Sequence, residues 1–306
     1  MANSIELVTK FLPILDEIYQ KEAKSSFLEA PSTLVQQTQD AKTIKIAKIA
    51  MDGLGDYSRN EGFPDGDVTL SWQTHTFTND RGRSFSVDKM DNVESLSLTF
   101  ASLMAEFMRT KIIPEVDAYR FAKIASTTDI EGTTGTLTDS TTKAAIVDGL
   151  KALENNQVDL SKLVLAMTPD TKYFLENNIQ RTVMNGEGGY NQLVETFNTV
   201  PIITVPQVRF YDKIDLYDGK TTGQTAGGYV KHVKGTGEGD VAGVDINFIL
   251  MDRAAAYAIT KNAVTRVFSP DVNQKMDAWK VDYRFYHDLF VNDNRKAGIY
   301  VHKKAS

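Results

Sequence analysis

The sequence predicts an α+β fold with more than one lobe, and three observations support this prediction. Strand-like and helical segments follow one another irregularly, without the regular strand–helix–strand order of a doubly wound sheet. The chain has 306 residues, more than one compact core usually contains. Residues 62–92 are typical of a long hairpin whose apolar side has no neighbouring segment to cover it.

The N-terminal segment begins with an amphipathic helical pattern. Charged residues interrupt its apolar positions, so it has neither a signal-peptide core nor a membrane span. Pro13 lies inside the pattern and can kink the helix. The pattern fits two arrangements, a helix packed on its own domain or an arm that leaves it. The apolar positions are Ile5, Val8, Phe11, Leu12, Leu15 and Ile18.

Residues 62–92 are expected to form two antiparallel arms, each with one apolar and one polar side. Apolar and polar side chains alternate along both arms, as in strands that are buried on one face. The sequence Asn-Asp-Arg-Gly at residues 79–82 favours a turn between the arms. The apolar positions are Val68, Leu70 and Trp72 on the first arm and Phe85 and Val87 on the second.

This hairpin needs a covering surface, because an isolated hairpin is only marginally stable in water. Burying its five apolar side chains contributes roughly 8 to 15 kcal/mol, at about 1.5 to 3 kcal/mol each. Association costs on the order of 4 to 15 kcal/mol, so one docked hairpin about breaks even. Many such contacts in a closed assembly would hold, because each is made by a subunit that is already immobilised. We therefore expect the cover to be an identical subunit.

Arg81 and Arg83 lie at the expected turn and are the polar candidates for the same contact. Their guanidinium groups can reach carboxylates on a neighbour. The alternative is a solvated tip that contributes little energy, as most surface charges do.

Periodicity and capping signals predict further elements around the hairpin. Strands are expected at residues 42–51, 163–167, near 200–210, 246–251 and 279–285. Helices are expected from residue 94 to about 125 with a bend or break at Pro114, at 142–155, from Pro169 onward and at 253–259. Residues 218–243 are dense in glycine and are expected to form a loop.

Several segments in this order resemble the major capsid proteins of tailed bacteriophages with the Hong-Kong-97 fold. They are GLGDYSRNEGFPDGDVTLSW at 53–72, DRGRSFSVDKMDN at 80–92, FMRTKIIPEVDAYRFAKIAS at 107–126 and WKVDYRFYHDLFVNDNRKAGIYVH at 279–302. The resemblance extends from about residue 40 to the end. Its specificity lies in the order and spacing of the segments, which contain no catalytic signature.

The resemblance implies an organisation for the chain. Residues 1–41 would form an N-terminal arm, 42–58 a strand of the peripheral domain, and 59–92 an extended loop that lies over a neighbouring subunit. Residues 93–160 would hold the spine helix and the peripheral domain, and 161–250 the axial domain with the glycine-rich loop at 218–243. Residues 251–306 would complete both domains.

The resemblance also implies partners and a place of action. The chain would assemble with itself as pentamers and hexamers into an icosahedral virion shell around double-stranded DNA, inside a bacterial host. Because no long extra segment precedes the expected arm, a separate scaffolding protein is expected, together with a portal protein. The alternative within the same fold is an encapsulin-type bacterial compartment that encloses a protein cargo.

Composition and motifs argue against other functions. The formal charge is −6 and the basic residues are scattered, which disfavours tight binding to nucleic acid. The absence of cysteine excludes disulfides and thiolate chemistry. Gly219, Lys220 and Thr221 imitate the end of a phosphate loop, but Ile214 stands where that motif requires glycine. The four histidines have no metal-ligand spacing, and no hydrolase motif occurs, so we expect no enzyme activity, cofactor or metal.

Overall fold

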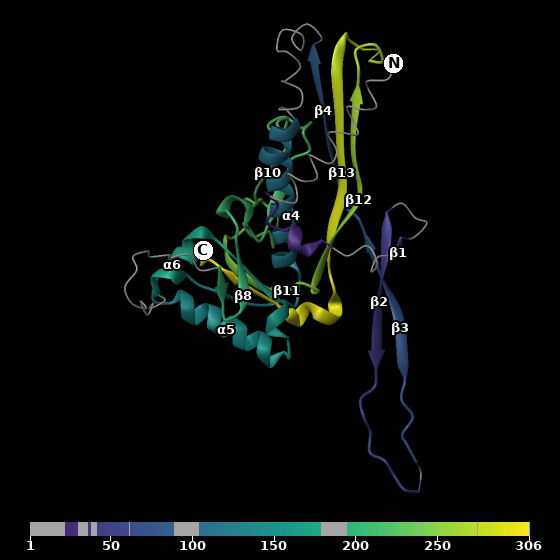
Figure 1. Ribbon diagram of the computed structural model, residues 1–306, viewed down its shortest axis with the longest axis vertical. Coiled ribbons are helices and arrows are strands. Elements are labelled where there is room, and N and C mark those ends of the chain that lie inside the picture. The colour runs from purple at the N-terminus through teal and green to yellow at the C-terminus, as the bar shows by residue number, and fades with distance from the viewer. Residues whose placement is uncertain are drawn as a thin grey trace, which may run out of the picture.

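The structure is a computed structural model with three parts: a lobe built on a six-stranded sheet, a long three-stranded sheet with a helix against it, and a projecting hairpin (Figure 1). It describes residues 22–29, 36–37, 42–60, 62–88, 104–178, 195–237, 239–273 and 275–305. The helical pattern at residues 5–18 and the start of the helix expected from residue 94 lie outside the described residues.

The lobe contains a mixed sheet in the order β5-β14-β11-β6-β8-β7. Helix α5 (Thr142–Asn155) covers one face, where Leu165 and Leu250 are buried, and helix α4 packs on the other, where Ala166 and Ile249 are buried. The two central strands therefore have no exposed side chain. The strands are β5 (Glu131–Thr134), β14 (Ile299–Lys303), β11 (Ile246–Asp252), β6 (Leu163–Met167), β8 (Val200–Thr204) and β7 (Thr196–Phe197), and α6 (Pro169–Asn178) lies beside α5.

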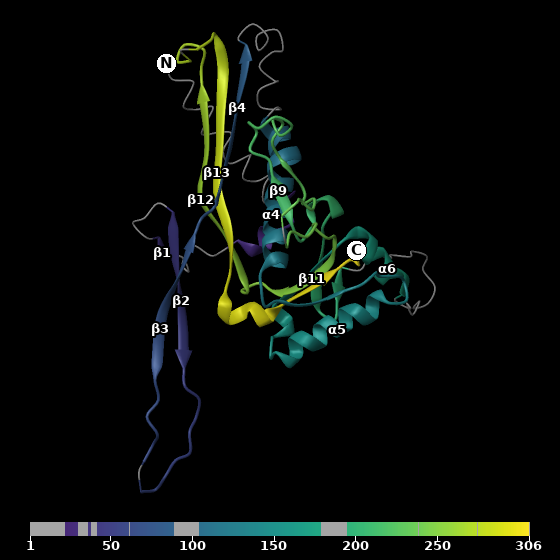
Figure 2. The ribbon, with the colours of Figure 1, turned by 180° about the vertical axis from the view of Figure 1, so that it is seen from behind.

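The long sheet has the order β12-β13-β4, formed by β12 (Ala256–Phe268), β13 (Ala278–Val291) and β4 (Asn79–Asp88). All three strands are antiparallel. A helix that runs over residues 104–126 packs on this sheet, and side chains such as Met108 and Val116 meet Val281 and Tyr283 there. Figure 2 shows this helix beside the sheet from the other side.

Pro114 does not break the helix, which differs from the prediction of a bend or interruption. The turn before it is a π-helical turn, η3 (Met108–Ile112), and Pro114 lies in the first turn of α4 (Ile113–Ser126). The wide π-helical turn leaves room for the proline ring, and the first turn of α4 does not require a backbone N–H donor at Pro114. The backbone therefore accommodates Pro114 locally while the apolar face continues.

The projecting hairpin is formed by β2 (Thr43–Met51) and β3 (Val68–Thr76), with residues 52–67 connecting them at the tip. The predicted pairing of the arm at residues 68–73 with the arm at 84–88 is wrong. After Phe77 and Thr78 the chain continues as β4, which pairs with β13. The turn-forming residues 79–82 lie within β4, because a strand partner about two hundred positions away outweighs the local turn preference.

The other predicted helices and strands are mostly confirmed, with differences at residues 253–259 and in the glycine-rich segment. The expected strands at 42–51, 163–167 and 246–251 and the helix at 142–155 are confirmed. The helix expected at 253–259 is wrong, because Ala256 and Ala258 face a buried cluster with Leu289 and belong to β12. The glycine-rich segment contains β10 (Tyr229–Lys231), which pairs with β9 (Ile214–Leu216).

The remaining short elements are β1 (Gln36–Gln37) beside β2 and the 3-10 turns η1 (Ser26–Leu28), η4 (Leu160–Lys162), η5 (Gln207–Arg209) and η6 (Asp293–Gly298). Among the residues that the structure describes, no helix has the length and apolar character needed to cross a lipid bilayer.

Candidate functional site

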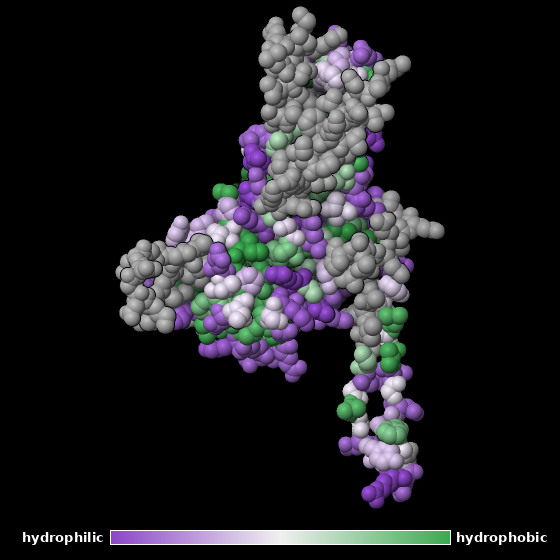
Figure 3. Space-filling model, in the orientation of Figure 1, coloured by the Kyte–Doolittle hydropathy of each residue, from purple (hydrophilic) through white to green (hydrophobic). Residues whose placement is uncertain are grey.

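The hairpin exposes apolar side chains along its length. Val68, Leu70 and Trp72 are 71%, 57% and 45% exposed, and Phe63 near the tip is 85% exposed. Figure 3 shows hydrophobic residues along this projection, which stands apart from the body. Large apolar side chains that gather on an exposed element are typical of an interaction surface. The apolar side chains expected on one face of the first arm are therefore largely exposed in the described part of the chain.

Several contacts join the described residues of the hairpin tip, 52–60 and 62–67. The backbones of Ser58 and Gly62 exchange two hydrogen bonds, of 3.1 and 2.8 Å, and the rings of Tyr57 and Phe63 lie 4.8 Å apart. Gly62 has a φ of 86°, a conformation that favours glycine. These contacts hold the two aromatic side chains together at the end of the projection.

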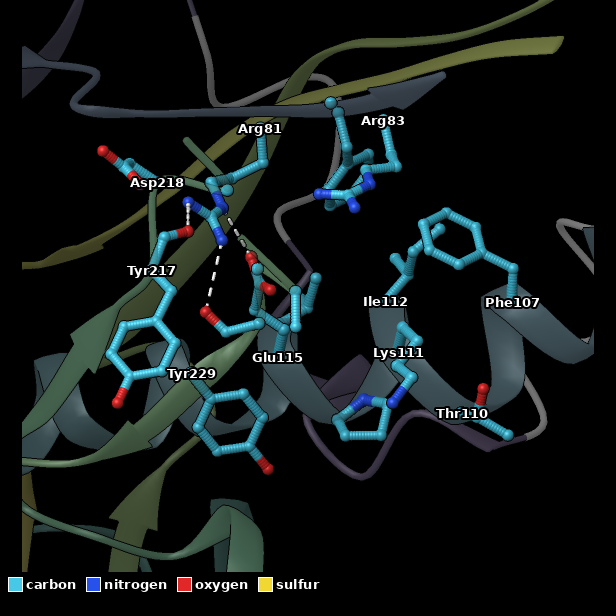
Figure 4. Close-up of a pocket in the computed structure, with 18 of the residues that line it drawn as sticks. Arg81, Arg83, Phe107, Thr110, Lys111, Ile112, Glu115, Tyr217, Asp218 and Tyr229 are labelled. Carbon is cyan, nitrogen blue, oxygen red and sulfur yellow. Dashed lines mark hydrogen bonds and ion pairs between the residues drawn. The ribbon is translucent and has the colours of Figure 1, made fainter. Parts of the chain in front are cut away.

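Arg81 was predicted at the tip of a hairpin. It lies instead on β4, against the body of its own chain. Its Nε is 2.7 Å from Oε1 of Glu115 on α4, and its other nitrogens donate to the carbonyl oxygens of Tyr217 and Gly228 (Figure 4). The guanidinium group therefore links β4, the helix and the β9–β10 segment.

The other residues predicted on the second arm also lie on β4. Arg83 is exposed, and both of its terminal nitrogens donate to the carbonyl oxygen of Thr225 at 3.2 Å. Phe85 is half-buried, with its ring 4.7 Å from that of Phe107. Val87 is half-buried and faces Trp279 of β13 in the register. Both apolar side chains thus have partial cover within the molecule.

A groove of about 950 Å³ lies between β4, the helix and the β9–β10 segment. Its charged lining has six basic and three acidic side chains, so its net formal charge is +3. The basic residues are Arg81, Arg83, Lys111, Arg209, Lys220 and Lys231, and the acidic residues are Asp80, Glu115 and Asp218. His287 also lines it, but burial lowers the pKa of His287 to about 3, so this side chain is neutral at physiological pH.

Some of these basic side chains have carboxylate partners and others do not. Arg209 lies 3.2 Å from Asp117, and Lys231 pairs with Asp245. Within the described part of the chain, Arg83, Lys111 and Lys220 form no ion pair. The groove thus presents three basic groups whose charge is not neutralised by a bound carboxylate.

His232 lies between two carboxylates in the loop that follows β10. Its Nδ1 is 2.7 Å from Asp215 and its Nε2 is 2.9 Å from Asp240. Carboxylates can only accept, so both ring nitrogens donate when the imidazole is protonated. The hydrogen bonds from its ring nitrogens to Asp215 and Asp240 raise the pKa of His232. This cluster ties the glycine-rich loop to β9 and was missed by the sequence analysis, because residues 215, 232 and 240 have no recognised spacing.

Comparison with solved structures shows extensive similarity in fold. The capsid of cyanophage P-SCSP1u superposes with a TM-score of 0.59 and 12% identity, over 89% of this chain and 86% of that one. The Gordonia phage Cozz structure gives 0.55 and 14%, over 93% and 87%. The virus-like particle from Pyrococcus furiosus gives 0.54 and 11%, over 97% and 99%.

The chain has the fold of a tailed-phage capsid protein. No family model and no curated protein matches the sequence, so the similarity lies in structure. The expected α+β capsid fold with a long helix is therefore confirmed. The helix expected from residue 94 to about 125 is described over residues 104–126. The projecting hairpin, expected within residues 62–92, is formed by β2 and β3 instead.

The structure shows which contacts are made by the segment that imitates a phosphate loop, residues 218–221. The carboxylate of Asp218 accepts the backbone N–H groups of Lys220 and Thr221 at 2.8 and 2.9 Å and the Thr221 hydroxyl at 2.6 Å. These hydrogen bonds lower the pKa of Asp218 to about 2. The donors that would cradle a phosphate are thus already bound to an anion of the chain. No metal-binding cluster occurs among the described residues.

The sequence analysis missed the aromatic pair at the tip and the groove. Tyr57 and Phe63 could have been found, because they are large apolar residues in a segment rich in glycine and aspartate. The groove could not, because β4, α4 and the β9–β10 segment lie far apart in the sequence and meet only through the pairing of β4 with β13.

Proposed function

We propose that this chain is the major capsid protein of a tailed bacteriophage, which assembles as pentamers and hexamers into an icosahedral shell around double-stranded DNA. The observation that carries the proposal is the capsid fold, which matches phage capsid structures over 85% or more of this chain. The protein would act as a structural component of the virion, without catalysis or a cofactor.

The exposed hairpin supports self-assembly. Val68, Leu70 and Trp72 on β3 are 45 to 71% exposed in the described part of the chain. A contact with an identical subunit would bury them, and a closed shell would repeat that burial at every subunit. Of the residues first assigned to the second arm, Arg81, Arg83 and Phe85 line the groove and would serve on the receiving side.

The parts of the structure can be assigned to the parts of the capsid fold. The long sheet and the helix over residues 104–126 would form the peripheral domain, and β2 and β3 the extended loop. The six-stranded lobe with the glycine-rich segment at 218–243 would form the axial domain, where subunits meet at the centre of a capsomer. Residues 1–41 would form the N-terminal arm.

Electron microscopy of the purified protein tests the assembly. Expression of the chain alone and together with its expected scaffolding protein should give uniform hollow shells in negative stain. Only monomers or irregular aggregates under both conditions, at high protein concentration, would contradict the proposal. A portal protein would occupy one vertex of the complete head and is not needed for this test.

A second candidate, an encapsulin-type compartment that encloses protein cargo, has one observation in its favour. The virus-like particle from Pyrococcus furiosus matches 97% of this chain. The two candidates differ in contents and in neighbouring genes. Nuclease-protected double-stranded DNA in particles from the native source, and genes for terminase and portal nearby, support the phage capsid. Protein cargo and an adjacent ferritin-like or peroxidase gene support the compartment.

The overall charge fits a container for DNA. The formal charge is −6 and the basic residues are scattered along the sequence, so we expect weak non-specific binding to DNA, because contacts with phosphate supply most of that affinity. A wall that binds DNA weakly permits both filling and emptying. Strong retardation of DNA by the purified protein at physiological salt would contradict this part of the proposal.

A further inference from the structure

We propose that residues 75–79 and strand β13 form a latch that holds the projecting hairpin in one direction at neutral pH and releases it in acid. The chain passes from the hairpin into the long sheet at these residues (Figures 1 and 2). The inference goes beyond the proposed function, because it concerns a movement within the single subunit and can be tested before any shell forms. It depends on three titratable side chains that lie together at this junction, His75, His287 and Asp288.

Aromatic contacts form the part of the latch that is nearest the hairpin. The ring of His75 lies 4.8 Å from that of Phe290 on β13, and the ring of Phe77 lies 5.2 Å from that of Phe290. Ile44 of β2 belongs to the same buried cluster as Phe77 and Phe290. Nε2 of His75 is buried and has no hydrogen-bond partner among the described residues. The imidazole therefore packs here as an apolar ring, and this environment favours its neutral form.

Hydrogen bonds form the other part of the latch. Thr78 donates to the carboxylate of Asp288 through its backbone N–H, at 2.8 Å, and through its hydroxyl, at 3.0 Å. The side-chain nitrogen of Asn79 lies 2.9 Å from Nε2 of His287, and because an amide nitrogen can only donate, Nε2 accepts and the ring is neutral. Nδ1 of His287 is buried without a hydrogen-bond partner in the part of the chain that the structure describes. The closed latch thus holds one carboxylate and two neutral imidazoles.

The charged and titratable groups that face the latch come from α4, β4, β13 and η6. His75 is faced by Asp293, Lys123 and Asp288, His287 by Arg120, Asp288, Arg81 and Lys123, and Asp288 by Tyr119 and Lys123. Burial is the largest effect on both imidazoles, and it lowers the pKa of His75 below 6.5 and that of His287 to about 3. Burial acts against the ionised form of Asp288, but hydrogen bonds from Thr78 and Lys123 outweigh it and lower the pKa of Asp288.

Acid opposes each of these protonation states. A proton on either imidazole places a charge among apolar rings, whereas a released, solvated imidazole has its ordinary pKa near 6.5. The released form therefore binds more protons, and its population rises as the pH falls below 6.5. Each pH unit below that value favours the released form by up to about tenfold for each imidazole that becomes solvated. Asp288 adds to the same trend only below about pH 4, where its carboxylate is protonated in the released form.

Release would free the hairpin and leave the rest of the subunit folded. Beyond the junction, β4 stays paired with β13 as far as Asp88 and Ala278. The hairpin also contacts the body near the latch, where Nε2 of Gln73 donates to Asp293 at 2.7 Å, but farther along β3 Leu70 is 57% exposed. Strands β2 and β3 pair along nine residues, so the hairpin would move as one unit.

Distances between two spin labels test the latch in the unassembled subunit, because the chain has no cysteine of its own. Thr69→Cys on β3 is combined with Lys143→Cys on α5, both at exposed positions. Pulsed electron paramagnetic resonance should give one narrow distance distribution at pH 7.5, and this narrow distribution should be lost at pH 4.5. The control pair is Ala263→Cys on β12 with Lys143→Cys, which does not include the hairpin and should keep its distance at both pH values. Loss of both distances together would overturn the proposal, because acid would then unfold the whole subunit.

Substitutions at His75 separate the charge of the imidazole from its aromatic character. His75→Lys carries a charge at every pH of the experiment and should lose the narrow distance already at pH 7.5. His75→Phe keeps an aromatic ring that cannot be protonated, so the midpoint of the change should move about one pH unit lower. Thr74→Lys is the matched control, because it adds the same charge at the neighbouring exposed position, and it should keep the narrow distance at pH 7.5. Equal effects of the two lysine variants, or an unchanged midpoint in His75→Phe, would overturn the proposal.

The outcomes separate this inference from the proposed function. If the distance from Thr69→Cys to Lys143→Cys is the same at pH 4.5 and pH 7.5, the latch is wrong and the proposed capsid function stands. If that distance changes as expected but the chain forms no shells, the latch stands and the proposed function fails.

Discussion

The hydroxyl of Ser25 donates a buried hydrogen bond of 2.6 Å to the carboxylate of Asp117 in the middle of helix α4. The same carboxylate accepts the backbone N–H groups of Lys24 and Ser25, each at 3.0 Å. Arg209 approaches it from a third segment at 3.2 Å. One carboxylate with no exposed surface thus fixes residues 22–29 to the helix.

Asp117→Ala should therefore destabilise the subunit by about 2 to 4 kcal/mol, because it leaves two backbone donors and a guanidinium group without their partner. Chemical denaturation of the unassembled protein measures this. Ser25→Ala removes a single donor and should cost about 1 kcal/mol. Equal and small effects of both changes would contradict the anchoring role of Asp117.

Asp288 on β13 gives an acid-dependent prediction. Burial alone would raise the pKa of Asp288, but hydrogen bonds from the Thr78 N–H and the Lys123 ammonium outweigh it and lower that pKa. Its contribution to stability is therefore complete above the unfolded pKa, near 4, and is lost as the pH falls through the lower folded value. Asp288→Asn should destabilise the subunit by about 1 to 3 kcal/mol at pH 7 and flatten the decrease in stability below pH 4.

Urea denaturation midpoints between pH 2.5 and 7 would measure this effect. Lys123 is about one third exposed, so Lys123→Met should cost less than the change at Asp288. If stability decreases below pH 4 in the Asp288 variant as it does in the unmodified protein, other carboxylates control the acid sensitivity.

His232 gives a prediction of the opposite sign. Hydrogen bonds to Asp215 and Asp240 raise its pKa above 6.5, so its contribution is complete below pH 6.5 and is lost as the pH rises through the folded value. Hydrogen exchange of the loop at residues 233–243 should therefore be faster at pH 9 than at pH 6, after correction for intrinsic exchange rates. His232→Gln should remove the pH dependence, and its persistence in that variant would contradict the role of the imidazole.

The exposed apolar side chains of the hairpin predict that a mutation can prevent assembly without affecting the folding of the subunit. Leu70→Lys with Trp72→Lys should change the free energy of unfolding by no more than about 0.5 kcal/mol, since both side chains are exposed in the subunit. The same variant should form no shells in negative stain. Val272→Lys, at a residue that is 62% exposed on the β12–β13 turn, is a matched control for added charge on an exposed apolar site. Normal shells from the double variant would show that Leu70 and Trp72 do not contribute to the interface between subunits.

Gly149 in helix α5 predicts a reversal of the usual helix preference. Alanine normally stabilises the interior of a helix by up to about 1 kcal/mol relative to glycine. At Gly149 an added Cβ would lie 2.9 Å from both Leu250 and Tyr300, so the helix could not approach the sheet as closely. Gly149→Ala should therefore lower stability by about 1 to 3 kcal/mol, measured by thermal unfolding of the subunit. A stabilising effect would mean that the sheet yields to the added methyl group.

Much of the fold could be predicted because local patterns and tertiary structure agree. The helix at 142–155 and the strands at 163–167 and 246–251 have apolar spacing that matches their burial. The strand β12 could not be predicted, because Ala254 and Ala255 just before it and Ala256 at its start have high helix propensity. Its strand conformation comes from pairing with β13, which the local sequence does not encode.

The candidate site was predictable in part for the same reason. The alternation of Val68, Leu70 and Trp72 indicates an apolar face whatever its partner is, and the three side chains are exposed in the subunit. Their contact with a second subunit stays a prediction. The choice of partner strand depends on contacts across the chain, so the sequence analysis paired residues 68–76 with the wrong segment. Arg81 was consequently placed at a tip, whereas its partner Glu115 lies in the helix of the same subunit.

Only Phe77 and Thr78 separate the hairpin from the long sheet, and neither residue forms a loose joint. The ring of Phe77 is buried 5.2 Å from that of Phe290, and the Thr78 N–H donates to Asp288 at 2.8 Å. A force that displaces the projection is thus transferred to β13 and to the helix packed on it. In a closed particle, internal pressure would then spread from subunit to subunit through continuous β-structure, and the wall would deform elastically as one sheet of material.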